Sequence, residues 1–328
     1  MKIQKYPFIS VIIPVEEFNP FLGESLPKYK DLDYPNFEVL VFTTKPCNKK
    51  FTKVKFIPEP SYAKNPAKKR DLALKYAKGE WFAFIDDDAY PSESWLRNAS
   101  RYFDDNIIAA ICGPGVTPKN VSVLEKASGW VSASKLGGAS YTYRFIPQSK
   151  RYVDDYPSMN LIIRKKDFEK VGGFDSSFYP GEDTKLCLDI TYGLNKKIIY
   201  DPNVLVYHHR RSLFKKHLLQ NGKYGVHRGY FARTLPQTSR RLSYFIPTFF
   251  TLGILSGPIL YFLSYPLFLL WTATVLIYIF LLSLTSVWVY SKEKNVRVSL
   301  LVIPGIFLTH IWYGIKFIQG FLSKELRR

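Results

Sequence analysis

The first residues that could do chemistry are three consecutive carboxylates, Asp86, Asp87 and Asp88, directly after the apolar run Trp81 to Ile85. An apolar run of this length predicts a buried strand. If the chain stays extended beyond it, Asp86 and Asp88 face the same way and Asp87 points elsewhere. Two converging carboxylates repel each other unless a proton or a cation lies between them. Mg²⁺ or Mn²⁺, which completes its coordination shell with phosphate oxygens, fits such a pair.

Two other interpretations of these carboxylates stay open from the residues alone. Aspartate is common in turns, so the run could be an acidic turn that only caps the next segment. Carboxylates at a strand end would also serve a Mg²⁺-dependent phosphotransferase with an aspartyl nucleophile. The rest of the sequence has to decide between them.

A second acidic motif is the pair Glu182-Asp183, which follows Gly181. Acidic residues are favourable in the first turn of a helix, where free N–H groups and the helix dipole attract carboxylates. The turn sequence Gly172-Gly173-Phe174-Asp175 stands a few residues before the pair. First-turn acids are ordinary by themselves, but the combination with a preceding glycine turn is less so.

Strands and helices alternate around these motifs. The predicted strands are Phe8 to Pro14, Phe37 to Phe42, Val54 to Ile57, Trp81 to Ile85, Ile107 to Cys112 and Asn160 to Arg164; the predicted helices include Asn65 to Lys78, Val121 to Ser134 and Lys166 to Val171. This alternation predicts an α/β domain with a mostly parallel sheet and helices on its faces. Ligands of such sheets bind beyond the carboxyl ends of the strands, where the three aspartates lie.

The order of five motifs carries a family resemblance. They are SVIIPV at 10–15, KGEWFAFIDDD at 78–88, VGGFD at 171–175, GEDTKLCLD at 181–189 and YDPNVLVYHHRR at 200–211. With them, residues 8 to about 230 resemble glycosyltransferase family 2 of the GT-A fold, which implies a Rossmann-like, mostly parallel sheet with helices on both faces. The resemblance also implies inverting transfer of a sugar from a nucleotide-sugar donor with a Mn²⁺ or Mg²⁺ cofactor.

The resemblance implies roles for the acidic residues. Asp86 and Asp88 would meet the donor ribose and the metal, with Asp88 the stronger metal candidate and Asp87 beside the donor. Asp183 would take the proton from the acceptor hydroxyl, and Glu182 would position the acceptor. The metal would offset charge that develops on the leaving diphosphate, a separate task from proton removal.

Two basic positions carry competing interpretations. His208 or His209 could contact the metal or the diphosphate, or the two could form a surface pair beside the membrane. Arg70 could reach the donor phosphates, or it could share a solvated face with Lys68 and Lys69.

The end of the second predicted strand departs from the family pattern. Family members usually carry acids there to read the nucleobase, whereas this chain has Phe42-Thr43-Thr44-Lys45. Glu16 or Glu17 after the first strand could take part instead, and Pro14 and Thr43 are the remaining donor-binding candidates at these two strand ends. We expect UDP as the nucleotide.

The charges are unevenly distributed along a chain of net charge +19. Of the 27 Asp and Glu residues, 25 lie at or before Asp201, and residues 202–292 contain none. Nucleic acid or anionic lipid could match such a basic segment. The uncharged run from Leu242 to Ser291 favours lipid, because about 20 apolar residues cross a bilayer. It predicts transmembrane helices near 244–263 and 267–289. A third apolar helix near 298–320 is predicted either to span the membrane or to be re-entrant.

These patterns predict three regions: a catalytic domain over residues 1–205, a basic amphipathic juxtamembrane segment over 206–241, and a membrane domain over 242–328. No signal peptide pattern opens the chain, so we expect a multi-pass protein of the cell membrane with a cytoplasmic catalytic domain. The juxtamembrane segment carries nine Lys or Arg and is expected to lie on anionic lipid. Its candidates for the acceptor or membrane face are Gln220, Arg228, Arg210 and Arg211. Nucleic acid is not an expected partner, because the segment has no recognition motif.

The acceptor can be narrowed by chemistry. A phosphate acceptor is already ionised, whereas a sugar hydroxyl needs a base, so Asp183 favours a hydroxyl on a lipid-linked or cell-surface glycan. The Gln-x-x-Arg-Trp motif of processive synthases is absent around Gln220, which favours transfer of a single sugar. The alternatives are a polyprenyl-phosphate glycosyltransferase and a non-catalytic membrane-tethered GT-A binding protein.

Overall fold

The computed structural model describes residues 6–62, 65–179 and 181–326, and the chain divides into two compact units. The first unit consists of Met1–Val116 and Ile146–His209, and the second of Thr117–Phe145 and Arg210–Arg328. The region predicted as one domain, residues 1–205, is therefore interrupted. Residues 117–145 pack with the C-terminal helices, a long-range association that no local sequence pattern indicates.

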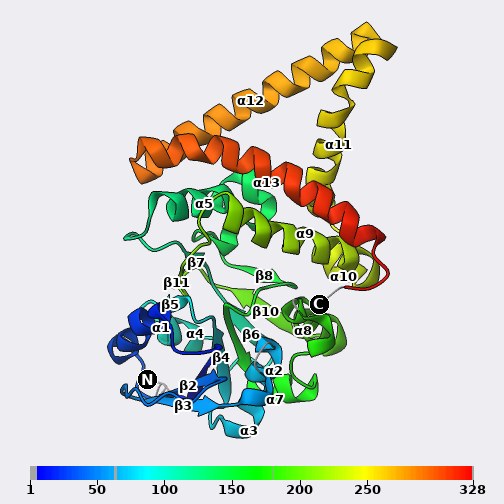
Figure 1. The fold of residues 1–328 in the computed structure, drawn as a ribbon. Helices are drawn as coiled ribbons and strands as arrows, with labels where there is room; N and C mark the ends of the chain where they lie inside the picture. Colours follow the sequence, from blue (N-terminus) through cyan, green and yellow to red (C-terminus); the bar gives the residue numbers. More distant parts are fainter. Residues whose placement is uncertain (1–5, 63–64, 180, 327–328) are drawn as a thin grey trace. The chain divides into compact units, whose positions relative to one another are not determined.

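Among the described residues of the first unit, eight strands form one sheet in the order β3-β2-β1-β4-β9-β6-β10-β8 (Figure 1). They are β1 (Ile9–Pro14), β2 (Phe37–Thr43), β3 (Val54–Pro58), β4 (Trp81–Ile85), β6 (Ile108–Cys112), β8 (Arg151–Val153), β9 (Asn160–Arg164) and β10 (Lys197–Tyr200). Strands β3, β2, β1 and β4 are parallel neighbours, and β6 is parallel to β10. β9 runs antiparallel between β4 and β6, and β8 lies antiparallel beside β10. The predicted mostly parallel α/β sheet is confirmed.

The helices of the first unit are short. They are α1 (Pro20–Ser25), α2 (Pro66–Asp71), α3 (Ala73–Tyr76), α4 (Trp95–Ser100), α7 (Lys165–Lys170) and α8 (Glu182–Leu188), with single turns at Leu26–Asp31, Pro60–Tyr62, Ser176–Phe178 and Asp189–Gly193. Asn65 caps α2, since its side chain accepts a hydrogen bond from the Lys68 N–H at 3.1 Å. The helix predicted to run from this cap to Lys78 is divided into α2 and α3.

Neighbouring residues of β4 show that both faces of the sheet are covered. Trp81 stacks on Phe103, which follows α4, with ring centroids 4.1 Å apart. The ring of Phe82 packs edge-on against that of Phe168 of α7, with ring centroids 5.9 Å apart. Because successive side chains of a strand point to opposite faces, these two partners lie on opposite sides of the sheet. All five residues of β4 are buried, which makes it a rigid support for the aspartates that follow it.

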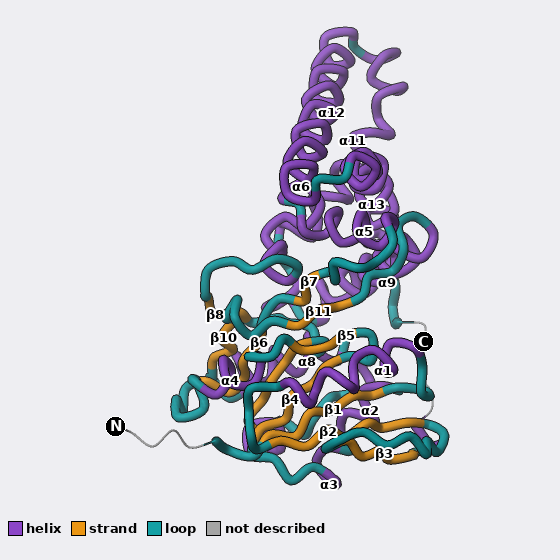
Figure 2. The backbone as a smooth tube through the Cα atoms, turned by 90° about the vertical axis from the view of Figure 1, so that its left-hand side faces the viewer, coloured by secondary structure: helices purple, strands orange, loops and turns teal. Residues whose placement is uncertain are grey.

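The second unit is helical. It contains α5 (Val123–Ala133), α6 (Lys135–Gly138), a turn at Ala139–Arg144, α9 (Lys215–Thr234), α10 (Pro236–Ser239), α11 (Leu242–Leu263), α12 (Tyr265–Glu293) and α13 (Val296–Leu322). α11 and α12 form a hairpin that opens from Ser264, and α13 runs alongside α9 (Figures 1 and 2). A cluster of Val, Ile, Leu and Ala side chains from α5, α12 and α13 forms its core.

Glycines allow α9 and α13 to approach closely. A Cβ atom on Gly229 of α9 would collide with the backbone carbonyl of Phe317, and one on Gly320 of α13 would collide with the carbonyl of Val226. Gly222 likewise faces the Trp312 ring. Stripes of small residues of this kind bring helix backbones together in membrane proteins.

In the described part of the second unit, α11, α12 and α13 are long and apolar enough to cross a membrane. Protein covers 6% of the most apolar window of α12 and 17% of that of α11, but 39% of that of α13. α13 therefore directs much more of its surface to protein contacts than the other two helices do.

Candidate active site

Backbone pairing in a second, smaller sheet gathers the metal candidates. In the described part of the first unit, β5 (Ala89–Pro91), β11 (Val206–His208) and β7 (Gly115–Val116) form this sheet. β11 pairs antiparallel with β5, so that His208 lies opposite Ala89. This pairing brings the His208 Nε2 atom to 3.0 Å from Asp88 Oδ1. One ligand atom each of Asp86, Asp88 and His208 lie within 4.8 Å of one another.

The neighbouring residues Asp87 and His209 point away from this group. Asn19, the cap of α1, donates from Nδ2 to Asp87 Oδ2 at 2.5 Å. Burial, and next the charge of Asp88, raise the pKa of Asp87 to about 6. The His209 Nε2 atom lies 3.0 Å from Glu24 Oε2. Asp86 and Asp88 therefore converge while Asp87 does not, although the chain turns at Asp87 and Asp88 instead of staying extended, and His208 rather than His209 joins them.

Arg70 joins the two acidic motifs. Its Nη2 atom donates to Asp86 Oδ1 and its Nη1 atom to Glu182 Oε1, both at 2.9 Å. The side chain is 7% exposed, so the interpretation of Arg70 as a solvated surface cation is wrong. Its fork-shaped guanidinium holds two carboxylates from distant parts of the chain, a geometry that one lysine ammonium cannot reproduce. In this structure Arg70 therefore binds carboxylates of its own chain, which disfavours its predicted contact with the donor phosphates.

The acid pair opens helix α8, as the sequence predicts. Asp183 Oδ1 accepts from the N–H of Thr184 at 2.9 Å, and its Oδ2 accepts from the N–H of Ser158 at 3.4 Å. Glu182 is buried, and burial raises its pKa to about 7 against the lowering effect of Arg70. Glu182 thus forms an ion pair with Arg70, whereas the half-buried Asp183 accepts hydrogen bonds from backbone N–H groups.

The ends of β1 and β2 lie side by side, with Pro14 opposite Phe42. Thr43 is fully buried, which disfavours the predicted contact of its side chain with a donor. The next residue, Thr44, is half-buried and accepts a hydrogen bond from Lys69 Nζ at 2.7 Å. Lys69 also donates to the Val15 carbonyl at 2.5 Å, and burial lowers its pKa.

Glu16 and Glu17, the other base-reading candidates, are exposed at the end of β1. The backbone carbonyl of Glu16 accepts from the N–H of Thr44 at 2.8 Å, and Glu17 forms a surface ion pair with Lys45. Both carboxylates therefore stand at the edge where the β1 and β2 ends meet.

The residues predicted for the acceptor or membrane face lie in the second unit: Gln220 and Arg228 on α9, and Arg210 and Arg211 before it. Arg228 lies with its guanidinium carbon 4.8 Å from the Tyr244 ring and donates to Ser239 Oγ at 3.2 Å. The backbone N–H of Arg210 donates to Glu125 of α5 at 3.0 Å. Arg211 is exposed.

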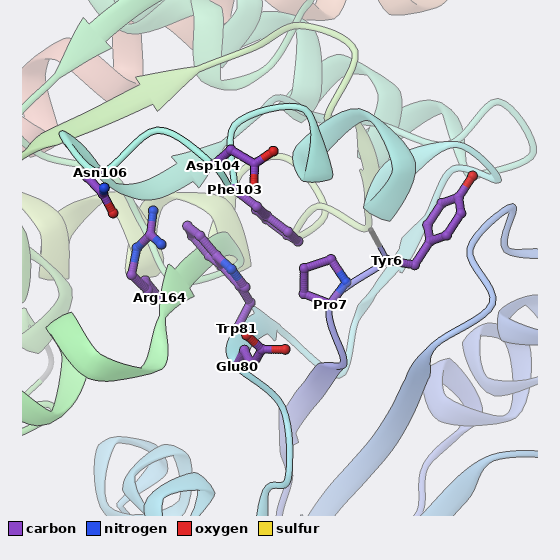
Figure 3. A pocket seen from close by; sticks show the side chains of 8 residues that line it. All are labelled: Tyr6, Pro7, Glu80, Trp81, Phe103, Asp104, Asn106 and Arg164. Carbon is purple, nitrogen blue, oxygen red and sulfur yellow. The ribbon is translucent and has the colours of Figure 1, made fainter. Parts of the chain in front are cut away.

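A cavity of about 570 Å³ lies at the opposite end of β4 (Figure 3). There the Trp81 ring lies between the Phe103 ring at 4.1 Å and the Arg164 guanidinium at 4.5 Å. Trp81 begins β4, whereas Asp86 follows its last residue. The cavity therefore does not belong to the acidic site.

The donor set of Asp86, Asp88 and His208 fits a divalent ion of the Mn²⁺ type. Carboxylates are the usual protein ligands of Mg²⁺ and Mn²⁺, and imidazole is a common ligand of transition metals. A divalent cation would offset the part of the repulsion between the two carboxylates that Arg70 does not balance, and the His208 Nε2 atom already lies within hydrogen-bonding distance of Asp88.

Comparison with known proteins decides the family. Residues 10–172 match the sequence model of glycosyl transferase family 2, a segment that contains most of β1 and the Asp86–Asp88 run. The chain belongs to glycosyl transferase family 2. This family consists of glycosyltransferases, so the match also gives the enzyme class.

Two relatives extend the family assignment. Over 168 residues the chain is 28% identical to the pre-mycofactocin glycosyltransferase of Mycobacterium tuberculosis, a match that covers 50% of this chain and 34% of that protein. The chain thus spans about a third of that relative's length. A Methanococcus voltae enzyme is 25% identical over 245 residues, or 69% of this chain and 74% of that enzyme. It is named dolichyl N-acetyl-alpha-D-glucosaminyl phosphate 3-beta-D-2,3-diacetamido-2,3-dideoxy-beta-D-glucuronosyltransferase.

A solved structure shares the fold over almost the whole chain. It is the mannosyltransferase PcManGT from Pyrobaculum calidifontis in complex with GDP-Man and Mn²⁺. The TM-score is 0.57 at 17% identity, and the alignment covers 98% of this chain and 89% of that one. The similarity establishes the GT-A fold of this family 2 chain.

Three contacts of the site have no clear sequence signal. They are the Arg70 bridge, the bond from Asn19 to Asp87, and the bonds from Lys69 to Val15 and Thr44. The partners are separated by between 16 and 112 residues, so only the folded sheet brings them together. In the sequence, the helix after Asn65 stands out for its run of basic residues, Lys68 to Arg70, and such a run is by itself typical of a helix face exposed to solvent.

Proposed function

We propose that this protein transfers a single sugar from a nucleotide-sugar to a hydroxyl of a lipid-linked or cell-surface glycan, with inversion and with Mn²⁺ or Mg²⁺ as cofactor. The observation that carries the proposal is the convergence of Asp86, Asp88 and His208 at the carboxyl end of β4, joined through Arg70 to the Glu182-Asp183 pair. This arrangement combines a cation site with a carboxylate suited to remove a proton.

Asp183 is the proposed general base. Its carboxylate takes the proton of the acceptor hydroxyl while the acceptor oxygen bonds to the anomeric carbon. The bond from that carbon to the diphosphate oxygen breaks, and nucleoside diphosphate leaves from the opposite face, which inverts the configuration. The backbone N–H groups of Ser158 and Thr184 orient the carboxylate. General-base assistance of this kind typically contributes about 10²- to 10⁴-fold in rate.

Asp86, Asp88 and His208 are the proposed metal ligands. When bound, the cation would supply positive charge that offsets the charge developing on the leaving diphosphate. His208 also holds the side chain of Asp88 in place, through the contact at 3.0 Å.

The donor is proposed to lie over the ends of β1 and β2. Pro14, Glu16, Thr44 and Asp87 are the nearest candidates for contacts with the nucleoside, since they stand at or beside these strand ends. A UDP-sugar is our first choice. GDP-mannose is the second, because the PcManGT structure contains GDP-Man.

A lipid-linked acceptor is supported by the second unit and by one relative. The Methanococcus voltae enzyme, which this chain matches over most of its length, is named for a dolichyl-phosphate-linked sugar acceptor. We propose that α11 and α12 cross the membrane and that α13, with its larger protein-covered surface, lies re-entrant or along the interface beside α9. We propose that the basic residues before α11 meet anionic lipid on the cytoplasmic side and that the catalytic unit is cytoplasmic as well.

Release of nucleotide from donor tests the proposal. The purified full chain in detergent is given UDP-sugars and GDP-mannose with and without Mn²⁺, and free nucleotide is measured. We expect Mn²⁺-dependent release by the wild type, a loss of about 10²-fold or more in Asp88→Asn through the lost charge stabilisation, and wild-type rates in Asp31→Asn, which changes an exposed carboxylate of the same unit. Donor binding without release from any donor would instead indicate a non-catalytic GT-A binding protein.

A further inference from the structure

The Arg70 bridge connects the two acidic motifs of the site. Both of its hydrogen bonds are 2.9 Å long. The Arg70 and Glu182 side chains are 7% and 6% exposed, whereas Asp86 is 31% exposed and belongs to the candidate metal group. One guanidinium therefore connects a solvent-accessible metal ligand to a buried acid next to the proposed base.

The bridge also balances a concentration of negative charge. The charges of Asp86, Glu182 and Asp183 all act on Arg70. Separate carboxylates in a partly buried site repel one another, and a buried charge without a partner is costly. Arg70 offsets this repulsion with a side chain that stays charged.

We infer that Arg70 is a positioning residue that couples cation binding at Asp86 to the placement of Glu182 beside the acceptor. The inference rests on the proposed function, because it assumes the Asp86, Asp88 and His208 metal site. A cation bound to Asp86 competes with Arg70 for the charge of the same carboxylate. The guanidinium is then attracted more strongly by Glu182, and Glu182 is held more firmly next to Asp183.

Coupling of this kind must be reciprocal. If the cation strengthens the Arg70–Glu182 pair, the charge of Glu182 must tighten cation binding by the same factor, because it draws Arg70 away from Asp86. The consequence is that cation binding at Asp86 and the placement of Glu182 beside the acceptor favour each other. A purely structural Arg70 would instead leave Glu182 to act on the cation only directly through space.

Mn²⁺ affinity separates these two possibilities without any need for the acceptor. Free Mn²⁺ is titrated by electron paramagnetic resonance against the full chain in detergent, in the wild type, Glu182→Gln, Arg70→Lys and the double variant. We expect Glu182→Gln to weaken Mn²⁺ binding about tenfold in the wild type, a typical coupling between linked sites, but less than twofold in the Arg70→Lys background. A single ammonium keeps the charge but cannot bridge both carboxylates. Glu169→Gln, which changes an exposed acid on α7, is the control and should leave the affinity unchanged.

Each outcome bears on the inference. Equal effects of Glu182→Gln in both backgrounds would contradict the coupling, as strict additivity means that the residues act independently. No effect of Glu182→Gln in the wild type would contradict it as well, even if the Arg70→Lys protein failed to fold, which thermal melting reports. Absence of Mn²⁺ binding to the wild type would overturn the metal site of the proposed function, and the coupling with it. Binding with additive effects would overturn the coupling alone.

Discussion

The two units bury polar groups in different ways. In the first unit buried charges are paired: Arg70 bonds Asp86 and Glu182. In the second unit, the buried His217 of α9 lies between two hydroxyls, with Ser128 Oγ at 2.7 Å and Thr309 Oγ1 at 3.0 Å. A buried ion pair gives little net stability and is strongly disrupted when one partner is lost. We infer that the Arg70 pairs are retained for chemistry, whereas His217 packs α9 through neutral contacts.

Close packing shows the same difference. Around β4 the core is made of large side chains such as Phe82, Phe84 and Trp81. Between α9 and α13 the contact depends on glycines, which let two backbones meet. Large side chains pack around β4, whereas the absence of side chains at glycines allows α9 and α13 to pack. The two units should therefore respond differently to small substitutions.

The largest effect is expected in the first unit, at Asp183. Asp183→Asn should lower sugar transfer to lipid-linked acceptors in native membranes by about 10²- to 10⁴-fold, because the general base is lost. Mn²⁺ and nucleotide affinity should stay within about twofold, since asparagine keeps the size of the side chain and Asp183 is outside the metal group. Transfer is measured with radiolabelled donor, and affinity by titration. An unchanged transfer rate would show that Asp183 is not the general base.

An intermediate effect is expected in the second unit, at Gly229. Gly229→Ala should destabilise the helical unit by about 1–3 kcal/mol, the usual cost of overpacking, because the new methyl group collides with the Phe317 carbonyl. Gly253→Ala on α11 is the matched control, since no described atom lies within 4 Å of the position of its Cβ. Thermal melting in detergent measures both variants. Equal melting temperatures would mean that α9 and α13 do not pack through this stripe.

The smallest effect concerns protonation of His217. Burial lowers the pKa of His217 to about 4. The unfolded chain, with an ordinary histidine pKa of about 6.5, binds the proton first as pH falls, so the stabilising contribution is complete above about pH 6.5 and is lost towards pH 4. His217→Asn removes this dependence. The melting-temperature advantage of the wild type should shrink between pH 7.5 and pH 5, by the equivalent of at most about 2 kcal/mol. An advantage that is constant with pH would indicate a hydrated His217.

Much of the fold could be predicted from local pattern. The strand β4 has the predicted bounds, and α11, α12 and α13 cover the three predicted apolar stretches, because composition over such windows decides burial. The convergence of Asp86 and Asp88 was also predicted, but its stated reason was wrong, because the chain turns at Asp87 and Asp88 and does not stay extended. The sequence predicts a metal contact for either His208 or His209 but does not decide between them, because the answer depends on how β11 pairs with β5.

What could not be predicted depends on contacts between distant segments. Arg70 and Glu182 are 112 residues apart, and no periodicity indicates that they meet. The association of residues 117–145 with the C-terminal helices is of the same kind. It includes Lys126, which forms an ion pair of 2.7 Å with Glu293, one of the two acids that follow Asp201.

The most direct test of the account is the position of a bound cation. Crystals or frozen particles of the full chain are prepared with Mn²⁺ and UDP, and Mn²⁺ is located by anomalous scattering or as density that is absent without the ion. We expect the ion between Asp86, Asp88 and His208 with the diphosphate beside it. Nucleotide and ion bound elsewhere, with these three side chains turned away from both, would contradict the account.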